Sequence, residues 1–472
     1  MPSAYIPSDD THIQSFGDLC MKISNTIVPK VFVVILCASL FVGLITSLGV
    51  SYCVGAASQE EVPKDAVHIK TAEQLAAIGG EDSEGKYYVL DNDLDLVDEW
   101  APIDDFRGTF DGQGHTINNL YVLESSNRKY AGLFGEITYA ITINNVAVNI
   151  NINGLAATSA VGGLIGFSRT VDVVDSYVTG NIIVSGSSVT VGGLIGLSGD
   201  TVINNSYTTG DIVAEASQGR ACAGGLIGLS STIVVANSYA SGDVTALSSS
   251  QTYQPACAGG LIGYNMFDVI VENSFATGKI IATDVSSISA GYFVCAGGLI
   301  GYSGYGDVTV MNSYATGSIL VTASGHNTCA GGLIGYIWVG NVVAENSYTI
   351  SDIITSGKHT YAGDLVGYND GGVDAISCYS LSTQKIIGDT TNEAGVSLSP
   401  EEMKNKESFV GWDFDTIWTI DPDINEGYPS FITNNKCDLL GSFWFIALLV
   451  GVIVLVIVGV VYVLLKKSRS HN

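Results

Sequence analysis

The sequence has 472 residues, of which 47% are apolar and only 14% are charged. This composition is too hydrophobic for a disordered chain, and the chain is too long for one compact core of ordinary shape. The formal net charge of −27 leaves no basic surface for a phosphate backbone, so we expect no nucleic-acid partner. The 56 glycines follow no collagen period, which favours glycines at fixed positions of a repeated structure.

The chain begins with an N-terminal lead, residues 1–30, and continues into an apolar run over residues 31–54. Lys22 and Lys30 precede this run, which at ~1.5 Å per residue is long enough to cross a bilayer. The small residues that follow Val54 would also suit a signal peptidase. Residues 31–54 are therefore predicted to be either a cleaved signal sequence or a retained membrane anchor.

A second apolar run covers residues 443–465, and a basic cluster follows it at once. This order is typical of a transmembrane helix with a short cytoplasmic tail, here residues 466–472. With both basic flanks in the cytoplasm, residues 58–439 would lie outside the cell. They carry a formal charge of −29, because residues 1–57 carry −1 and residues 440–472 carry +3. The predicted location is thus the cell membrane, with a strongly acidic extracellular region.

The middle of the chain is a repeat built around the sequence GGLIG. Six copies and two degenerate ones end in glycines that are 30 to 38 residues apart, namely Gly135, Gly166, Gly196, Gly228, Gly263, Gly301, Gly335 and Gly367. A second block, usually Asn-Ser-Tyr, follows each copy from Gly166 onward. A fixed period of about thirty residues indicates stacked structural units that cannot bury a face alone.

Each unit contains three short β-branched segments: one around GGLIG, one ending at Asn-Ser-Tyr, and one after the Thr-Gly that usually follows. The glycines and β-branched residues disfavour helix. We therefore predict an all-β fold, a right-handed parallel β-helix of about eight three-strand coils over residues 127–384. With ~4.8 Å between stacked strands, this makes a rod on the order of 40 Å long.

The flanks of the repeat are predicted to cap the stack so that its strand edges are covered. Residues 58–126 would form an N-terminal cap with the first coil, and residues 385–432 a C-terminal cap. Short helical starts support this interpretation, because Thr71–Gln74 and Ser399–Glu402 are both capping boxes.

GGLIG followed by NSYATG closely resembles the GLUG-motif family of surface proteins, and the resemblance covers roughly residues 66–432. The segment from Leu90 to Ile117 is similar to the opening of such arrays, and the segment from Trp412 to Pro429 to their end. The family includes adhesin-like proteins and immunoglobulin A-specific metalloproteases, in which the repeats form a non-catalytic N-terminal region. This sequence contains no HExxH, so the resemblance does not imply protease chemistry.

Two residue series recur once per coil. The aromatic series is Tyr177, Tyr207, Tyr239, Phe275, Tyr314, Tyr348 and Tyr379, and asparagines such as Asn205 and Asn346 precede it by two residues. Counting strand alternation from Val173 places the rings inside the coil, as a structural ladder. A sugar-binding platform is the alternative. The asparagines are expected to bond to one another and to the backbone between coils.

Four cysteines, Cys222, Cys257, Cys295 and Cys329, each precede a Gly-Gly pair by two residues. Ala160 and Thr190 hold the same position in other copies, which favours a small buried site with free stacked thiols. Disulfides between adjacent coils are the alternative, because Cα atoms near 4.8 Å apart fall within the range that such bonds allow.

No catalytic, cofactor-binding or metal-binding residue is predicted. The six histidines lie outside any catalytic pattern, and the calcium-like spacings at Asp91–Asp95 and Asp421–Asn425 lack the glycine that a calcium loop needs. The predicted function is adhesion or surface display by a membrane-anchored, non-catalytic β-helix, with a host-cell, neighbour-cell, matrix or glycan ligand. A polysaccharide-processing β-helix enzyme and a carbohydrate-binding module are the alternatives.

Overall fold

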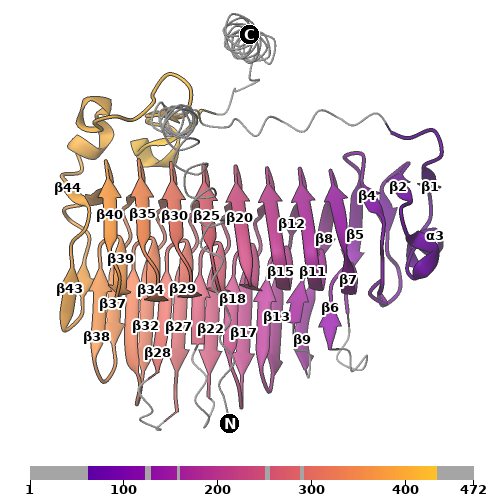
Figure 1. Ribbon diagram of the computed structural model, residues 1–472, viewed down its shortest axis with the longest axis horizontal. Helices are drawn as coiled ribbons and strands as arrows, with labels where there is room; N and C mark the ends of the chain where they lie inside the picture. Colours follow the sequence, from indigo (N-terminus) through magenta and orange to yellow (C-terminus); the bar gives the residue numbers. More distant parts are fainter. Residues whose placement is uncertain (1–61, 123–128, 157–159, 250–255, 287–291, 433–472) are drawn as a thin grey trace, which may run out of the picture. The chain divides into compact units, whose positions relative to one another are not determined.

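The computed structural model describes residues 62–122, 129–156, 160–249, 256–286 and 292–432 (Figure 1). The contacts divide the chain into Met1–Ser58 and Gln59–Asn472, and all the described residues belong to the second unit. The predicted membrane segments, residues 31–54 and 443–465, lie outside the described residues. Among those that are described, no helix is long and apolar enough to span a bilayer.

The fold is a parallel β-solenoid whose strands belong to four long sheets, here named A to D. Sheet A contains β1 (Val67–Ile69), β2 (Tyr87–Leu90), β4 (Thr109–Asp111), β7 (Phe134–Asn144), β11 (Ile165–Val174), β15 (Ile195–Asn204), β19 (Ile227–Ser230), β24 (Ile262–Asn265), β29 (Ile300–Tyr305), β34 (Ile334–Val339) and β39 (Val366–Asn369). A branch of sheet A begins beside β15 and contains β20 (Thr232–Ala236), β25 (Val269–Glu272), β30 (Val308–Met311), β35 (Val342–Glu345) and β40 (Val373–Ile376).

Sheet B contains short strands, many of which start with the aromatic residue of the repeat. They are β3 (Leu94–Asp95), β5 (Thr116–Leu120), β8 (Ala147–Ile150), β12 (Tyr177–Thr179), β16 (Tyr207–Thr208), β21 (Tyr239–Ala240), β26 (Phe275–Ala276), β31 (Tyr314–Ala315), β36 (Tyr348–Thr349), β41 (Tyr379–Leu381) and β44 (Val396–Leu398).

Sheets C and D complete the coils. Sheet C contains β6 (Tyr130–Ala131), β10 (Ala160–Gly162), β14 (Val189–Gly192), β18 (Ala221–Gly224), β23 (Ala256–Gly259), β28 (Phe293–Gly297), β33 (Asn327–Gly331), β38 (Thr360–Gly363) and β43 (Thr390–Asn392). Sheet D contains β9 (Ile152–Ala156), β13 (Ile182–Gly186), β17 (Ile212–Ala216), β22 (Val244–Ser248), β27 (Ile280–Asp284), β32 (Ile319–Ala323), β37 (Ile353–Ser356) and β42 (Ile386–Ile387).

Within the described residues, eight coils, from β6 to β42, contain a strand in each of the four sheets. The β-solenoid and its number of coils are as predicted, but three strands per coil is wrong. GGLIG does not lie in one strand, because its first glycine ends a strand of sheet C and its isoleucine begins a strand of sheet A. From the fourth of these coils onward, a turn also divides the sheet A segment into two strands.

The corner before sheet B explains the Asn-Ser part of the repeated block. The asparagine has a positive φ in each copy, for example 49° at Asn205 and 51° at Asn237, a conformation that asparagine tolerates better than most residues. The serine then bonds between coils: the backbone N–H of Ser206 donates to Ser238 Oγ over 3.1 Å, and Ser238 donates to Ala236 O over 2.7 Å. The buried serines of this corner are therefore paired within and between coils, as the interior of a solenoid favours.

The interior is one continuous apolar core, lined by Val, Ile, Leu and Ala from all four sheets. At the N-terminal end, β1 to β5 extend sheets A and B, and Thr71 caps the short helix α3 (Ala72–Ala76) through a bond from the Gln74 N–H. At the C-terminal end, Ser399 and Glu402 bond reciprocally as a capping box, but only the 3-10 turn η3 (Glu402–Lys404) follows.

The C-terminal residues form a separate aromatic layer rather than more coils. Its elements are the 3-10 turns η4 (Lys406–Ser408) and η5 (Asn425–Gly427) and the antiparallel pair β45 (Trp418–Thr419) and β46 (Ser430–Phe431). One further 3-10 turn, η1 (Glu81–Ser83), lies near the other end of the solenoid. Trp418 is fully buried in this layer, which packs against sheet B.

Candidate functional site

The aromatic series of sheet B lies on the outside of the solenoid, so its predicted inward direction is wrong. Val178, the residue after Tyr177, faces the core, whereas Tyr177 itself is only partly buried. The cause is Asp175, whose φ of 50° turns the chain and shifts the in-out alternation by one residue. The prediction counts alternating residues from Val173 as if the strand were continuous, and it therefore places Tyr177 on the inner face instead of the outer one.

The rings of this outer column cover one another. Tyr177, Tyr207 and Tyr239 stack with centroids 4.7 Å apart and planes within 5° of parallel, and Phe275 continues the column at 4.8 Å. Parallel rings at this spacing hide each other's faces and expose only their edges, so a sugar ring could not stack on them. The C-terminal layer buries the rest of the column, including Tyr348, whose hydroxyl donates to Pro429 O over 2.6 Å. The column is a structural ladder.

The four cysteines also form a column, and they are buried as predicted. Cys222, Cys257, Cys295 and Cys329 are partners in the parallel register of sheet C, and all four are free thiols. They do not face the core, because their neighbours Ala221 and Ala223 do. A row of sheet A side chains that includes Tyr264, Tyr302 and Tyr336 packs against them instead. Burial raises the pKa of the Cys222 and Cys295 thiols well above the ordinary value, which disfavours reactive thiolates.

The most exposed aromatic side chains gather at the turn that divides sheet A. We call this group the turn cluster: Met266, Phe267, Tyr305, Trp338 and Val339. They come from three consecutive coils, and Phe267, Tyr305 and Trp338 are 48%, 52% and 46% exposed. The rings of Tyr305 and Trp338 lie 5.1 Å apart and are tilted by 38°, so they do not cover each other completely.

Buried polar contacts hold the backbone of the turn cluster. Asn265 is fully buried, accepts a hydrogen bond from Ser230 Oγ over 2.7 Å and donates to Phe267 O. Gly306 and Gly340 bring the coils close together: a Cβ atom on Gly340 would lie 1.9 Å from Gly306 O. The exposed rings therefore stand on a rigid support, which lowers the entropy cost of binding a ligand.

A short polar row borders the turn cluster. Asp268, Asp307 and Asn341 are exposed residues in successive coils. Asp268 Oδ1 accepts from the Asp307 N–H over 3.0 Å, and Asp307 Oδ1 accepts from the Asn341 N–H over 2.8 Å. The surface thus combines partly open aromatic faces with two carboxylates.

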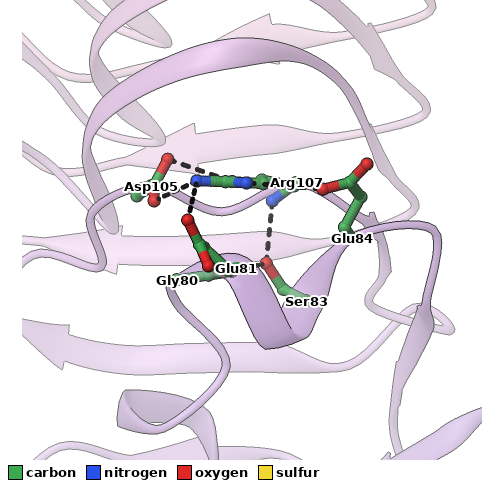
Figure 2. A network of polar contacts seen from close by, with 6 residues as sticks. All are labelled: Gly80, Glu81, Ser83, Glu84, Asp105 and Arg107. Atoms are coloured by element: carbon green, nitrogen blue, oxygen red, sulfur yellow. Dashed lines mark hydrogen bonds and ion pairs between the residues drawn. The ribbon is translucent and has the colours of Figure 1, made fainter.

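The first complete coil also has an aromatic residue at the sequence position of Phe267, although its strand β7 has no turn there, and a cation lies over this ring. Tyr139 lies four residues after Gly135, as Phe267 lies four after Gly263, and the guanidinium of Arg107 is 4.0 Å from its ring centroid. Figure 2 shows Arg107 among three carboxylates, with Nη2 2.8 Å from Asp105 and Nη1 3.3 Å from Glu84. Since its charge is compensated there, Arg107 is not a free anion site.

The carboxylates at the calcium-like spacings do not converge. Asp91 pairs with His68 over 2.6 Å, whereas Asp93 accepts from the Thr116 N–H over 2.9 Å and Asp95 accepts from Asn119. The part of the chain that the structure describes contains no group of three or more His, Cys, Asp or Glu that could hold a metal ion. The absence of a cofactor stays a prediction.

One serine–histidine contact brings together residues that the sequence did not connect. Ser286 Oγ and His326 Nε2 are 3.1 Å apart, on segments forty residues distant in the chain. Both side chains are almost fully buried, so a polymer substrate could not reach them. The pair is therefore no candidate for nucleophilic catalysis.

Sequence reasoning missed the turn cluster, although a signal was present. Aromatic residues follow the closing glycine by three or four positions in three consecutive copies, at Phe267, Tyr305 and Trp338. Non-aromatic residues stand there in the three preceding copies, with Thr170 and Asp200 as examples. The repeat pattern separates the segment around GGLIG from the segment ending at Asn-Ser-Tyr, but it predicts no exposed turn in the residues between them.

Comparisons with known proteins give one sequence match and several structural likenesses. The family model described as the GLUG motif matches residues 254–281, so the chain contains the motif that its repeats resemble. No curated protein matches the chain. A solved structure from Bacteroides ovatus, provisionally described as an immunoglobulin A1 protease, is 18% identical, with a TM-score of 0.42 over 78% of this chain and 92% of that one.

A second solved structure, described as an IgA1 protease, is 16% identical, with a TM-score of 0.38. The match covers 68% of this chain and only 22% of that protein. Both TM-scores are below 0.5, so neither likeness says what this chain does.

Proposed function

We propose that this chain is a non-catalytic β-solenoid that acts in adhesion or surface display, and that the turn cluster is its contact surface. Residues 31–54 and 443–465 would hold it in the cell membrane, with the acidic solenoid outside. The observation that carries the proposal is the turn cluster itself: three aromatic side chains, each about half exposed, from three consecutive coils on a rigid support. Exposed apolar patches of this kind are typical of interaction sites.

The shape of the solenoid supports contact rather than turnover. Polymer hydrolysis needs two carboxylates that face each other across a cleft. The carboxylates of Asp268 and Asp307, beside the turn cluster, instead follow one another along a row, and one oxygen of each accepts a hydrogen bond from a backbone N–H of the next coil. A polysaccharide-processing β-solenoid enzyme is the alternative function.

Incubation of the purified full-length protein with polysaccharides and proteins separates the two functions. Released reducing ends and released amines are measured over many hours. We expect neither to rise above the buffer control. Steady release that one Asp→Asn or Glu→Gln substitution abolishes would contradict the proposal and establish the enzyme.

A further inference from the structure

We propose that the turn cluster binds arginine side chains of a partner protein, with each guanidinium placed over an exposed ring and paired with Asp268 or Asp307. This inference rests on the proposed function and names the chemistry of the partner. It is drawn from the geometry of the cluster, from the charge of the chain and from an arginine that the chain itself places at the equivalent position.

The internal example is the contact between Arg107 and Tyr139. Both partners are in place: the ring of Tyr139, which lies in the undivided strand β7 of the first complete coil, and carboxylates, with Asp105 2.8 Å from the guanidinium. In the turn cluster the ring and the carboxylate recur, at Tyr305 and Asp307, but the described residues provide no cation there. An arginine of a partner would supply the missing cation.

Other contacts show that aromatic side chains elsewhere in the chain also accept cations. Arg220 lies 4.4 Å from the ring centroid of Tyr264, and Lys404 lies 4.6 Å from that of Tyr428. In the described residues no such pair involves Phe267, Tyr305 or Trp338. Part of each of these three rings therefore stays available to a partner.

Charge favours the same kind of partner. The chain carries a formal −27, and Asp268 and Asp307 are exposed beside the rings, so an anionic ligand would be repelled and a cationic one attracted. The three rings belong to successive coils about 4.8 Å apart. Several arginines of one extended segment could therefore bind together, and weak single contacts would add up.

The test uses a fluorescent peptide of alternating arginine and glycine, titrated with the full-length protein in non-ionic detergent and followed by anisotropy. A peptide with citrulline in place of each arginine has nearly the same shape without the charge. We expect the arginine peptide to bind at least about fivefold more tightly than the citrulline peptide. Raising the salt from about 0.05 M to about 0.5 M should weaken the binding.

Three variants locate the binding site. Trp338→Ala and Tyr305→Ala together should weaken binding about fivefold or more, and Asp307→Asn should weaken it and reduce its salt dependence. Asparagine is tolerated in this row, since Asn341 stands there in the next coil. Val202→Ala, a partly exposed residue of sheet A in a coil without a turn aromatic, is the matched control and should bind as the parent does. Thermal melting checks that each variant is folded.

Equal binding by the parent and the folded turn-cluster variants would overturn the inference, as would equal affinity for the citrulline peptide. Salt-independent binding of cellohexaose that Trp338→Ala abolishes would replace the arginine partner with a glycan and leave the proposed function intact. Self-association that Trp338→Ala abolishes, with no peptide binding, would show that a second copy occupies the site. Polymer cleavage would refute the proposed function itself.

Discussion

Gly298 lies directly beneath Gly332, so that a Cβ atom on Gly298 would be 2.0 Å from the Gly332 carbonyl oxygen. It would also lie 2.5 Å from the Ala315 Cβ atom, inside the core. The same close approach recurs at Gly225 and Gly260. The second glycine of GGLIG is thus required by the distance between coils, and no other residue fits there without moving the backbone.

We therefore predict that Gly298→Val lowers the free energy of unfolding by about 3 kcal/mol or more, because the side chain must displace backbone atoms. Denaturant unfolding followed by circular dichroism measures the change. Gly372→Val is the matched control, since a Cβ there has only the Asn341 side chain at 3.6 Å nearby. If both variants unfold alike, the glycines of GGLIG are not structural.

Stability should fall at alkaline pH. Burial raises the pKa of Tyr264 to about 12, and a 2.6 Å hydrogen bond to Asp370 helps raise the pKa of Tyr368 to about 12. An unfolded tyrosine ionises near pH 10, so the unfolded state loses its proton first. The contribution to stability is complete below about pH 10 and is lost as the pH rises toward about 12.

Melting temperatures recorded at increasing pH test this expectation. Tyr264→Phe removes one ionisable group and should make the decline between about pH 10 and about 12 shallower. A decline of unchanged slope in this variant would show that Tyr264 does not contribute.

The cysteine column predicts a two-step labelling pattern. In the folded protein, an alkylating reagent should leave Cys222, Cys257, Cys295 and Cys329 unmodified, because all four are fully buried with no exposed surface. After denaturation without a reductant, all four should react. Mass spectrometry of the proteolytic peptides identifies which cysteines are alkylated at each step. Cysteines that react only after reduction would reveal disulfides between adjacent coils.

The sequence predicts the period and the stacking of this fold well, because both follow from glycine spacing. The sequence predicts poorly whether a given side chain points into the core or out to the surface. One left-handed residue, Asp175, turns Tyr177 from the core to the surface, and no pattern of apolar residues reveals that φ value. The turn cluster has a related cause, since Phe267 reads as an ordinary strand residue until the turn between β24 and β25 exposes it.

The burial of the cysteines could be predicted, but not the face on which they lie. Replacement of cysteine by Ala160 or Thr190 in other copies indicates a small buried site. That site lies outside the core, under Tyr264 and its neighbours from sheet A. The outer faces of sheets A and C pack together at this site. The alternation of residues along a single strand cannot reveal such packing between sheets.

Whole-coil deletion tests contact at the turn cluster most directly. Cells that display the full chain are compared with cells displaying a deletion of residues 264–301, which removes Met266 and Phe267 of the turn cluster but keeps the repeat in phase. Deletion of residues 197–228 is the control, because Gly199 and Asp200 stand there at the positions that Trp338 and Phe267 hold after their closing glycines. Both should fold, since each coil contacts only its neighbours.

Attachment of these cells to immobilised proteins and to cell layers is the measurement. We expect the parent and the 197–228 deletion to attach alike to at least one of these surfaces, and the 264–301 deletion to attach several-fold less. Equal attachment by all three, or none by any of them, would contradict the view that this solenoid works by contact through its turn cluster.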